Sequence, residues 1–465
     1  DELDVVSLGD FLDTGTPCCP FTMFEGVTEL APGQMLIVNA EGKSASLPWW
    51  IAPAEDLSLR LEDGAEEYAR LWRRAVEKRC AGKRIGVQLS GGMDSRVVMA
   101  VVPRELECTG LTFCDELNRE ARISRQVAAA YGRQWIMLTR DPEYLGLTAP
   151  AATRFTGCEG EWHHAHALGL TRDFVDRGFD DVFTGLFMDN NFKGYYAEDI
   201  VPVTRLRGLL PPRHEIRRRD YIQATSAFCK RVLRSEVQEA RIRRRQFFYD
   251  SHFARGRQSE WEWLDGYPVS QASDNTGWFV ERRVMPLRLP VYDRALVELA
   301  LRIPTMMKVH GDFFGHAIVK VLGPGNEIPN ANDGARPGSS AVGKHLQRLA
   351  RKTQRSVITK LEKLGWRSSV QHSWHDYKHY WRTSPVIKSL LHDHADGLAE
   401  LGAAGSLEAI RAGLTDARLP WRQSYRLLQF ALWSKNLRQL KASPWQESGS
   451  IPTGAIAQDK AVNVT

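Results

Sequence analysis

The sequence predicts an α/β protein with a doubly wound, mostly parallel sheet, additional helices and a short N-terminal β segment. Short apolar runs alternate with longer segments whose apolar residues have helical spacing, as in a parallel sheet that is covered on both faces. In residues 84–102, RIGVQLSGGMDSRVVMAVV, two glycines separate one apolar run from the helix that follows. At 465 residues the chain is too long for one small core, so two domains or one enlarged domain are expected.

The expected helices and strands follow in order from residue 57. An amphipathic helix at 57–78 precedes the first strand and should pack on it. Because open parallel sheets bind ligands beyond the carboxyl ends of their strands, the site is expected there. The strands are expected where short apolar runs occur, at 84–89, 106–113, 134–138 and 181–184. The later helices are expected at 96–102, 120–131, 161–176, 295–301 and 420–440.

The two ends of the chain are expected to depart from this pattern. Residues 1–51 are predicted to be a small β-rich unit, because apolar and polar residues alternate at 34–39 and 44–49 around a turn. Residues 52–441 would hold the α/β domain, and residues 442–465 are expected to form a loose tail.

Composition argues against a membrane protein and against a disulfide framework. No apolar run reaches the ~18 residues of a membrane span, and the N-terminus lacks a signal pattern, so we expect a cytoplasmic protein. The seven cysteines show no CxxC pair, which argues against a cysteine zinc site as well. A net charge of +6 is compatible with nucleotides, acidic substrates or nucleic acid and does not choose among them.

The turn after the first expected strand has the residues of a phosphate cradle. Gly91 and Gly92 let backbone amides approach an anion closely, and the next helix directs its positive end to the same point. No Gly-Lys-Ser/Thr follows as in a P-loop; Asp94 stands instead between the hydroxyls of Ser90 and Ser95. A carboxylate beside bound phosphate needs a cation between them, so the turn implies Mg²⁺.

This turn resembles the SGGxDS pyrophosphate loop of the N-type ATP pyrophosphatases, and its surroundings resemble the asparagine synthetase family. After the fourth expected strand, TGLFMDNNFKGYY at 184–196 is similar to the family's SGEGSDELFGGY turn. The resemblance extends from residue 24 to residue 440 and implies the adenine-nucleotide α-hydrolase-like (PP-loop) fold. Residues 1–51 would be a remnant of the family's glutaminase domain without its nucleophilic cysteine, so glutamine hydrolysis is not expected within this chain.

The resemblance implies a site for ATP and Mg²⁺. Asp94 and Asp189, in the two turns, would be catalytic residues and would hold the metal ion. The residues expected to contact the nucleotide surround them and are Leu89, Ser90, Gly91, Gly92, Asp94, Ser95, Thr112, Phe113 and Gly185.

A first departure from the family concerns acyl transfer. Leu186 stands where the family has a glutamate at its acyl-transfer centre, so either another group handles the incoming amine or the substrate needs less help. The segment CEGEWHHAH could supply such a group at a polar pocket through one of Glu159, Glu161, His163, His164 and His166. A zinc site and plain surface positions are the alternatives for the histidines of this segment.

A second departure is a missing lysine. Relatives use a lysine on the activated α-phosphate, whereas EIPNANDGARPG at 327–338 contains none. Arg336 stands within one position of it and Lys344 follows a little later, so these two are the candidate catalytic cations. A guanidinium supplies charge but does not exchange a proton at pH 7.

The family's chemistry implies amide-bond formation in two steps: ATP adenylates a substrate carboxylate with release of pyrophosphate, and the acyl group then passes to ammonia or an amine. Because the glutaminase and two family residues are missing, the first hypothesis is an amidotransferase of natural-product biosynthesis that acts on a small-molecule or peptide carboxylate. A lasso-type peptide macrocyclase is the second. A nucleotide-binding pseudoenzyme or scaffold subunit and a PP-loop tRNA-modifying enzyme are further alternatives.

Two segments bear on partners. The basic residues within 205–245 are expected to form the solvated face of an amphipathic helix, with a groove for an acidic substrate, peptide or RNA as the alternative. No RNA-binding module accompanies them, so a nucleic-acid partner is not expected. The strand edges of a β remnant at 1–51 suggest a partner chain that completes it.

Overall fold

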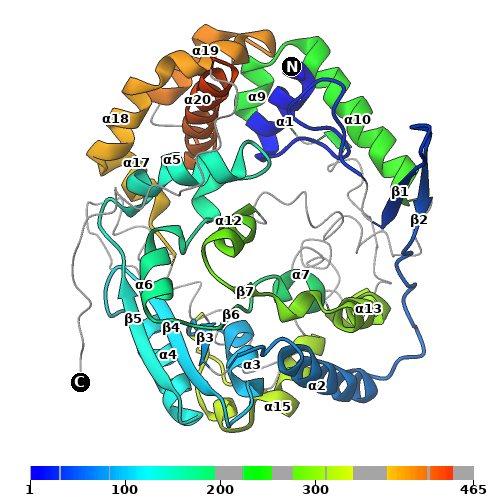
Figure 1. Ribbon diagram of the computed structural model, residues 1–465, viewed down its shortest axis with the longest axis vertical. Helices are drawn as coiled ribbons and strands as arrows, with labels where there is room; N and C mark the ends of the chain where they lie inside the picture. Colours follow the sequence, from blue (N-terminus) through cyan, green and yellow to red (C-terminus); the bar gives the residue numbers. More distant parts are fainter. Residues whose placement is uncertain are drawn as a thin grey trace, which may run out of the picture.

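A computed structural model describes most of the chain as an α/β protein, as the sequence predicts (Figure 1). The predicted tail after residue 442 and the candidate Lys344 lie outside the described residues. The described residues are 2–30, 33–82, 84–193, 222–223, 225–253, 276–308, 312–332, 334–338, 374–415 and 419–442.

The sheet has five strands, all parallel, in the order β5-β4-β3-β6-β7. In the central strand, Ile85 is paired with Cys108 of β4 on one side and with Asp181 of β6 on the other. The chain adds β4 and β5 on one side of β3 and then β6 and β7 on the other, so the order reverses between β3 and β6. An open sheet of this kind binds ligands at that reversal. The bounds are β3 (Arg84–Gln88), β4 (Glu107–Cys114), β5 (Gln134–Thr139), β6 (Asp181–Phe183) and β7 (Leu287–Arg288).

Helices cover both faces of the sheet, which confirms the doubly wound prediction. Phe183 belongs to one buried core and its neighbour Val182 to the other, because successive side chains of a strand point to opposite faces. The first face is covered by α2 (Leu61–Glu77), α3 (Met93–Val101), α4 (Arg119–Ala130), α13 (Arg294–Arg302) and α15 (Asp312–Leu322). The second is covered by α5 (Tyr144–Thr156), α12 (Thr276–Val284), α17 (Tyr377–Thr383), α18 (Pro385–Asp393) and α20 (Trp421–Ala442).

A helical layer brings the two ends of the described chain together, at the top of Figure 1. Its core contains Leu8 of α1 and Phe430 of α20. The predicted β-rich unit at the N-terminus is therefore partly helical: the Asp4 carboxylate accepts from the Ser7 amide at 2.8 Å and caps α1, whose apolar side is buried. The domain boundary at residue 51 stays a prediction. The layer consists of α1 (Val5–Thr14), α9 (Ala227–Val232), α10 (Ser235–Phe253), α19 (Leu407–Thr415) and part of α20.

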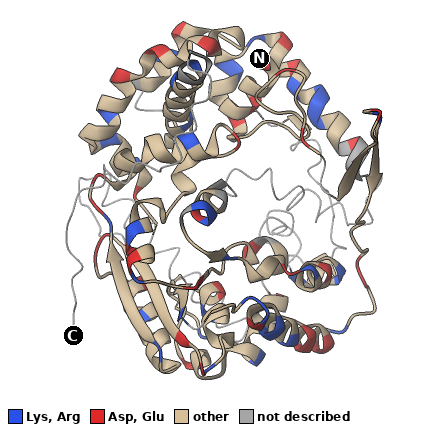
Figure 2. Ribbon diagram, in the orientation of Figure 1, with Lys and Arg blue, Asp and Glu red and all other residues tan. Residues whose placement is uncertain are grey.

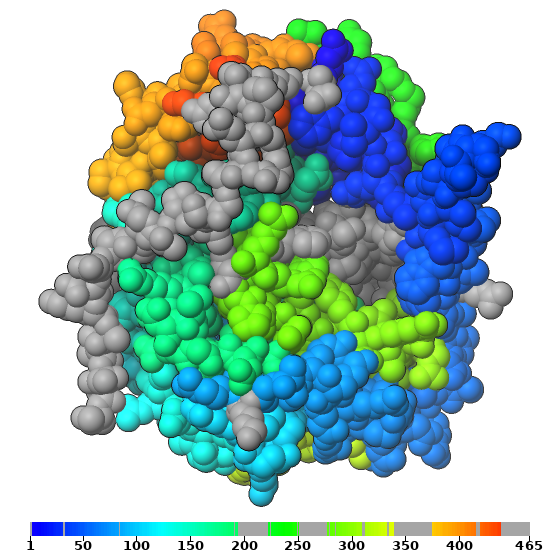
Figure 3. All heavy atoms as spheres, viewed as in Figure 1, coloured from blue at the N-terminus to red at the C-terminus, as the bar shows by residue number. Residues whose placement is uncertain are grey.

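The two alternating segments of the N-terminal region form a hairpin, as predicted. β1 (Gln34–Val38) pairs with β2 (Ser44–Pro48) in an antiparallel register that places Gln34 opposite Pro48. The hairpin projects from the side of the molecule, in blue in Figure 3, and all of its residues except Gln34 are exposed. A partner chain that covers these strands stays a prediction.

The prediction of a single helix at 161–176 is wrong for most of this segment. The Trp162 amide donates to Gln429 Oε1 at 3.2 Å, and the Ala167 amide donates to Glu281 Oε1 at 3.0 Å. Because these amides bond to side chains of other elements, tertiary contacts override the local helical pattern. The segment consists of two 3₁₀ turns, Trp162–His164 and Leu168–Leu170, followed by α6 (Thr171–Asp176).

The sequence predicts a solvated basic face at 205–245, of which residues 205–221 lie outside the described residues. In α10, whose basic residues Figure 2 marks in blue, the prediction holds for the exposed Arg243 but not for Arg241 and Arg245, which are buried. Arg241 donates to Asp10 Oδ1 at 2.8 Å and to Asp13 Oδ2 at 2.6 Å. These arginines neutralise the acidic side of α1, so within the described residues they do not form a free basic groove.

The remaining elements are short. They are α7 (Met188–Phe192), α14 (Thr305–Lys308) and the 3₁₀ segments Pro290–Tyr292, Gly323–Glu327 and Ala395–Ala403.

None of the helices in the described part of the chain is long and apolar enough to cross a membrane. All seven cysteines lie in that part and are free thiols.

Candidate active site

A cavity of about 260 Å³ opens at the carboxyl ends of β3 and β6, where the strand order reverses. Its walls come from the turn after β3, the turn after β6, the end of β4 and α12. Gly91 does not line it, because its amide and carbonyl face Glu120 and Ala331. The other eight residues predicted to contact nucleotide all line the cavity: Leu89, Ser90, Gly92, Asp94, Ser95, Thr112, Phe113 and Gly185.

The turn after β3 is held in shape by its own hydroxyls. Ser95 Oγ accepts from the Ser90 amide at 2.9 Å, and Ser90 Oγ accepts from the Gly92 amide at 3.1 Å. Gly92 is the N-cap residue of α3 and has no side chain with which to bond the first amides of the helix. The positive end of α3 is therefore presented to the cavity, as a site for phosphate oxygens requires.

The turn after β6 packs directly against the start of α3. A Cβ on Gly185 would lie 2.5 Å from the Ser95 amide nitrogen and 2.6 Å from the Asp94 carbonyl carbon. Real Cβ atoms do not approach backbone this closely, so only glycine lets the two turns meet. This contact brings Asp189, in the first turn of α7, to the same cavity as Asp94.

Asp94 and Asp189 converge on one cation, the ammonium of Lys193. Lys193 Nζ lies 2.7 Å from Asp94 Oδ1, 2.8 Å from Asp94 Oδ2 and 2.6 Å from Asp189 Oδ1. Burial alone would lower the pKa of Lys193, but the two carboxylate charges outweigh it and raise this pKa. Burial raises the pKa of Asp94 to about 6, against the lowering effect of Lys193.

The residues present fit a magnesium ion. Two carboxylates and nearby hydroxyls form the oxygen donor set that Mg²⁺ prefers, and the Lys193 ammonium is a stand-in cation at the point where the carboxylates meet. The sequence prediction missed Lys193. Two features of the sequence could have indicated Lys193: it stands four residues after Asp189, and it replaces a glycine of the family's SGEGSDELFGGY turn.

A buried glutamate lies in the same cavity and was also missed. Glu281 of α12 is 2 % exposed and lines the cavity together with Leu186. Its Oε2 accepts from Gln88 Nε2 at 3.1 Å, and its Oε1 accepts from the Ala167 amide at 3.0 Å. Burial raises the pKa of Glu281 to about 7, although the two hydrogen bonds oppose the shift. Glu281 can thus gain or lose a proton near neutral pH.

Comparison with known families decides the relationship. The sequence model of asparagine synthase matches residues 67–324, which is 258 of the 465 residues and more than half of the chain. The chain belongs to the asparagine synthase family. This family forms amide bonds at the expense of ATP, so the chain is a ligase of this general type. A search of curated proteins found no match.

The matched region of this asparagine synthase family member includes both turns, Lys193 and Glu281. It also includes Glu159, Glu161 and His163, none of which lines the cavity. In that segment only His166 reaches it, beside Trp374. Of the six residues that the sequence suggested for the acyl-transfer half of the site, Leu186 and His166 line the cavity.

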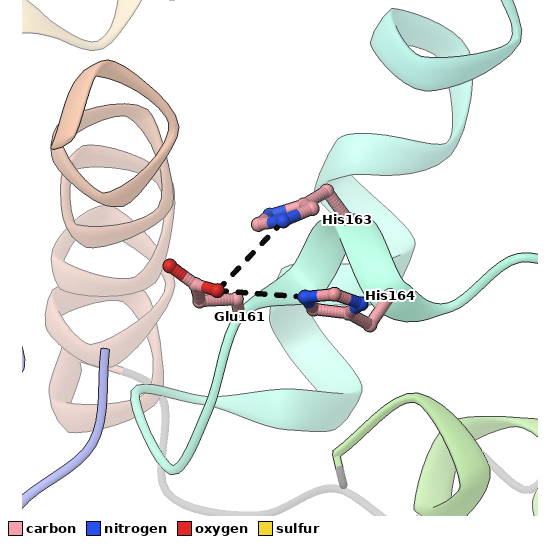
Figure 4. Close-up of side chains that lie close together, drawn as sticks. All are labelled: Glu161, His163 and His164. Carbon is pink, nitrogen blue, oxygen red and sulfur yellow. Dashed lines mark ion pairs between the residues drawn. The ribbon is translucent and has the colours of Figure 1, made fainter. Parts of the chain in front are cut away.

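Glu161 and the neighbouring histidines form a separate buried cluster (Figure 4). Glu161 Oε2 lies 3.8 Å from His163 Nε2 and 3.5 Å from His164 Nε2, and one ligand atom of each residue lies within 4.8 Å of the others. Arg426 Nε donates to Glu161 Oε1 at 2.7 Å. Arg426 thus pairs with one oxygen of the carboxylate, while the other faces the two histidines. The zinc alternative for these histidines stays a prediction.

Of the two cations predicted for the family's missing lysine, Arg336 does not line the cavity. Arg336 is exposed, and its guanidinium lies 3.2 Å from Glu327 Oε2 on the surface. Lys344 is not described. Among the described residues that line the cavity, Lys193 is therefore the lysine or arginine beside the phosphate turn, whereas Arg96 contacts that turn from the buried side.

Proposed function

We propose that this chain is an AMP-forming carbon–nitrogen ligase that adenylates a substrate carboxylate and transfers the acyl group to ammonia or an amine. The observation that carries the proposal is the cavity at the reversal of strand order, which combines a phosphate turn, two convergent carboxylates and a buried glutamate.

The proposed first step is attack of a substrate carboxylate on the α-phosphorus of ATP. The first amides of α3 and the hydroxyls of Ser90 and Ser95 bind phosphate oxygens, and Thr112 and Phe113 border the adenine. Asp94 and Asp189 hold Mg²⁺, which when bound offsets the charge of pyrophosphate. Adenylation is needed because a carboxylate has no adequate leaving group, whereas AMP is one.

The proposed second step uses Glu281 as the base. The amine nitrogen forms a bond to the acyl carbon, the bond from that carbon to the AMP oxygen breaks, and the amine proton passes to Glu281. Three points support this role: Glu281 lines the cavity beside Leu186, its two hydrogen bonds fix its orientation, and burial makes it more basic.

We place the substrate outside asparagine formation, among the carboxylates of natural-product biosynthesis. Leu186 gives this wall of the cavity an apolar side chain where relatives have an acid. A base supplied by α12 leaves room beside Leu186 for an acyl group with apolar character. This assignment rests on the site alone and names a class of carboxylate.

Pyrophosphate release tests the function. The purified protein is incubated with ATP and Mg²⁺ and a panel of carboxylic acids and peptides, each with and without ammonia, glutamine or an amine. Release and AMP formation that depend on one carboxylate are expected. Absence of both release and pyrophosphate exchange into ATP with every pairing would overturn the proposal and favour a nucleotide-binding pseudoenzyme.

A further inference from the structure

The cavity is strongly acidic before any nucleotide enters. Four carboxylates line it, from Asp94, Glu120, Asp189 and Glu281. Among the described residues that line it, Lys193 is the only lysine or arginine. A triphosphate adds further negative charge, so binding it needs cations, and Lys193 can supply one of them.

The position of Lys193 allows its ammonium to exchange one set of acceptors for another. Its ammonium contacts three carboxylate oxygens at 2.6 to 2.8 Å and lies 4.7 Å from the centre of the Phe314 ring. It follows the five-residue helix α7 directly, and 24 % of its side chain is exposed toward the cavity. A lysine ammonium on a flexible four-carbon stem can swing between acceptors, whereas an aspartate carboxylate has a much shorter side chain and stays close to its turn.

The carboxylate oxygens that bind Lys193 are the ones proposed to hold the metal. Magnesium–oxygen distances are about 2.1 Å, so Mg²⁺ and an ammonium cannot occupy the same point between Asp94 and Asp189. The ammonium must therefore leave when the metal binds. The turn after β3, where phosphate oxygens are proposed to bind, lines the same cavity, so a bound nucleotide would offer the ammonium new acceptors.

We propose that Lys193 is an exchangeable counter-ion of the ATP site: it closes the Asp94–Asp189 pair in the free enzyme and pairs with the phosphates once these carboxylates hold Mg²⁺. The inference rests on the proposed function. It gives Lys193 the role of the cation at the activated phosphate, which Arg336, bound to Glu327 on the surface, does not reach. Free metal therefore competes with the Lys193 ammonium for the two carboxylates. When the metal arrives with a nucleotide, the displaced ammonium gains the phosphates as new partners.

Binding of Mn²⁺ to the nucleotide-free protein, measured by electron paramagnetic resonance, tests the first half. Lys193→Met removes the competing charge and keeps the length of the side chain, so Mn²⁺ should bind at least tenfold more tightly than to the wild type. Lys193→Arg keeps the charge and should stay within about threefold of the wild type. Lys320→Met is the matched control, because Lys320 pairs with Glu62 and Glu66 on the outer side of α15.

Calorimetry with Mg²⁺ and α,β-methylene-ATP tests the second half. Lys193→Met should bind this analogue at least tenfold more weakly, since the phosphates lose a cation. The opposite signs for Mn²⁺ and for the nucleotide are the distinguishing result, because a merely structural lysine would weaken both. Circular dichroism checks that the variant is folded.

The outcomes separate the inference from the proposed function. If the wild type releases pyrophosphate but Lys193→Met binds free Mn²⁺ no better, the counter-ion role is overturned and the ligase stands. If the wild type binds neither Mn²⁺ nor the analogue and releases no pyrophosphate, both are overturned. If Lys193→Met loses affinity for both ligands while folded, Lys193 is a structural part of the turn.

Discussion

Two clusters of aspartates with basic side chains differ in balance and in access. Between α1 and α10, Arg241 and Arg245 face Asp10 and Asp13, and all four side chains are at least 94 % buried. At the cavity, the Lys193 ammonium alone pairs with both Asp94 and Asp189. The Asp94 side chain is 24 % exposed and the Asp189 side chain is 54 % exposed.

The difference indicates which cluster can take up a ligand. The α1–α10 cluster has one arginine for each aspartate and no open side, so a further ion would be buried without compensation. The cavity cluster has more carboxylates than cations and is open on one side. The first therefore stabilises the helical layer, and the second is available for chemistry.

The largest expected effect is on the cavity cluster. Asp94→Asn or Asp189→Asn should lower pyrophosphate release about 1,000-fold, because the oxygen donors for the metal are lost at the departing phosphate. The unfolding midpoint should change little, since neither side chain is fully buried. Asp176→Asn, at an exposed pair with Arg172, is the matched control. A variant with near-normal turnover would contradict the metal assignment.

Next is the α1–α10 cluster, where the effect should be on stability alone. Arg241→Met leaves Asp10 and Asp13 with one guanidinium and should cost about 3 kcal/mol of unfolding free energy in urea. Pyrophosphate release per folded molecule should not change. Arg243→Met, at an exposed pair with Glu239, should cost less than about 1 kcal/mol. Equal costs for the two variants would remove the distinction between the clusters.

A smaller effect, with a pH signature, is expected at Glu281. A base acts only when deprotonated, and burial raises the pKa of Glu281 to about 7, so amide formation should rise with pH through about 7. Glu281→Gln should lose this rise and form amide about 100-fold more slowly at pH 8, while pyrophosphate exchange stays near normal.

Stability gives an independent check of the same group. Since the folded-state pKa of Glu281 lies above its ordinary value, its contribution is most favourable at low pH and is lost as pH rises through about 7. The unfolding free energy of the wild type should therefore fall relative to that of Glu281→Gln between pH 5 and pH 8. Parallel pH curves would show that Glu281 titrates as in water.

The smallest effect should come from Arg336. Its pair with Glu327 is exposed on both sides, so Arg336→Gln should change stability by less than about 0.5 kcal/mol. Pyrophosphate release should stay within about threefold, because Lys193 is the cation that we propose at the phosphates. A 100-fold loss would return Arg336 to the catalytic role that the sequence suggested.

The residues at the carboxyl end of β3 could be placed in one turn from sequence because that part of the cavity is local. The strand, the Ser90–Ser95 turn and α3 follow one another, and glycine positions and apolar periodicity encode that geometry directly. The strand order and the conformation of residues 161–176 instead depend on contacts between distant parts of the chain. In the latter segment, amides bond to Gln429 and Glu281, which no local pattern indicates.

The sequence by itself determined the α/β class, the phosphate turn, the two aspartates and the family. Only the tertiary structure decided that the Lys193 ammonium lies between Asp94 and Asp189. It also decided that Glu281 lines the cavity and that Arg336 does not. The physical reason is separation along the chain. Asp94 and Lys193 are 99 residues apart and Gln88 and Glu281 are 193 apart, so their contacts depend on how helices pack on the sheet.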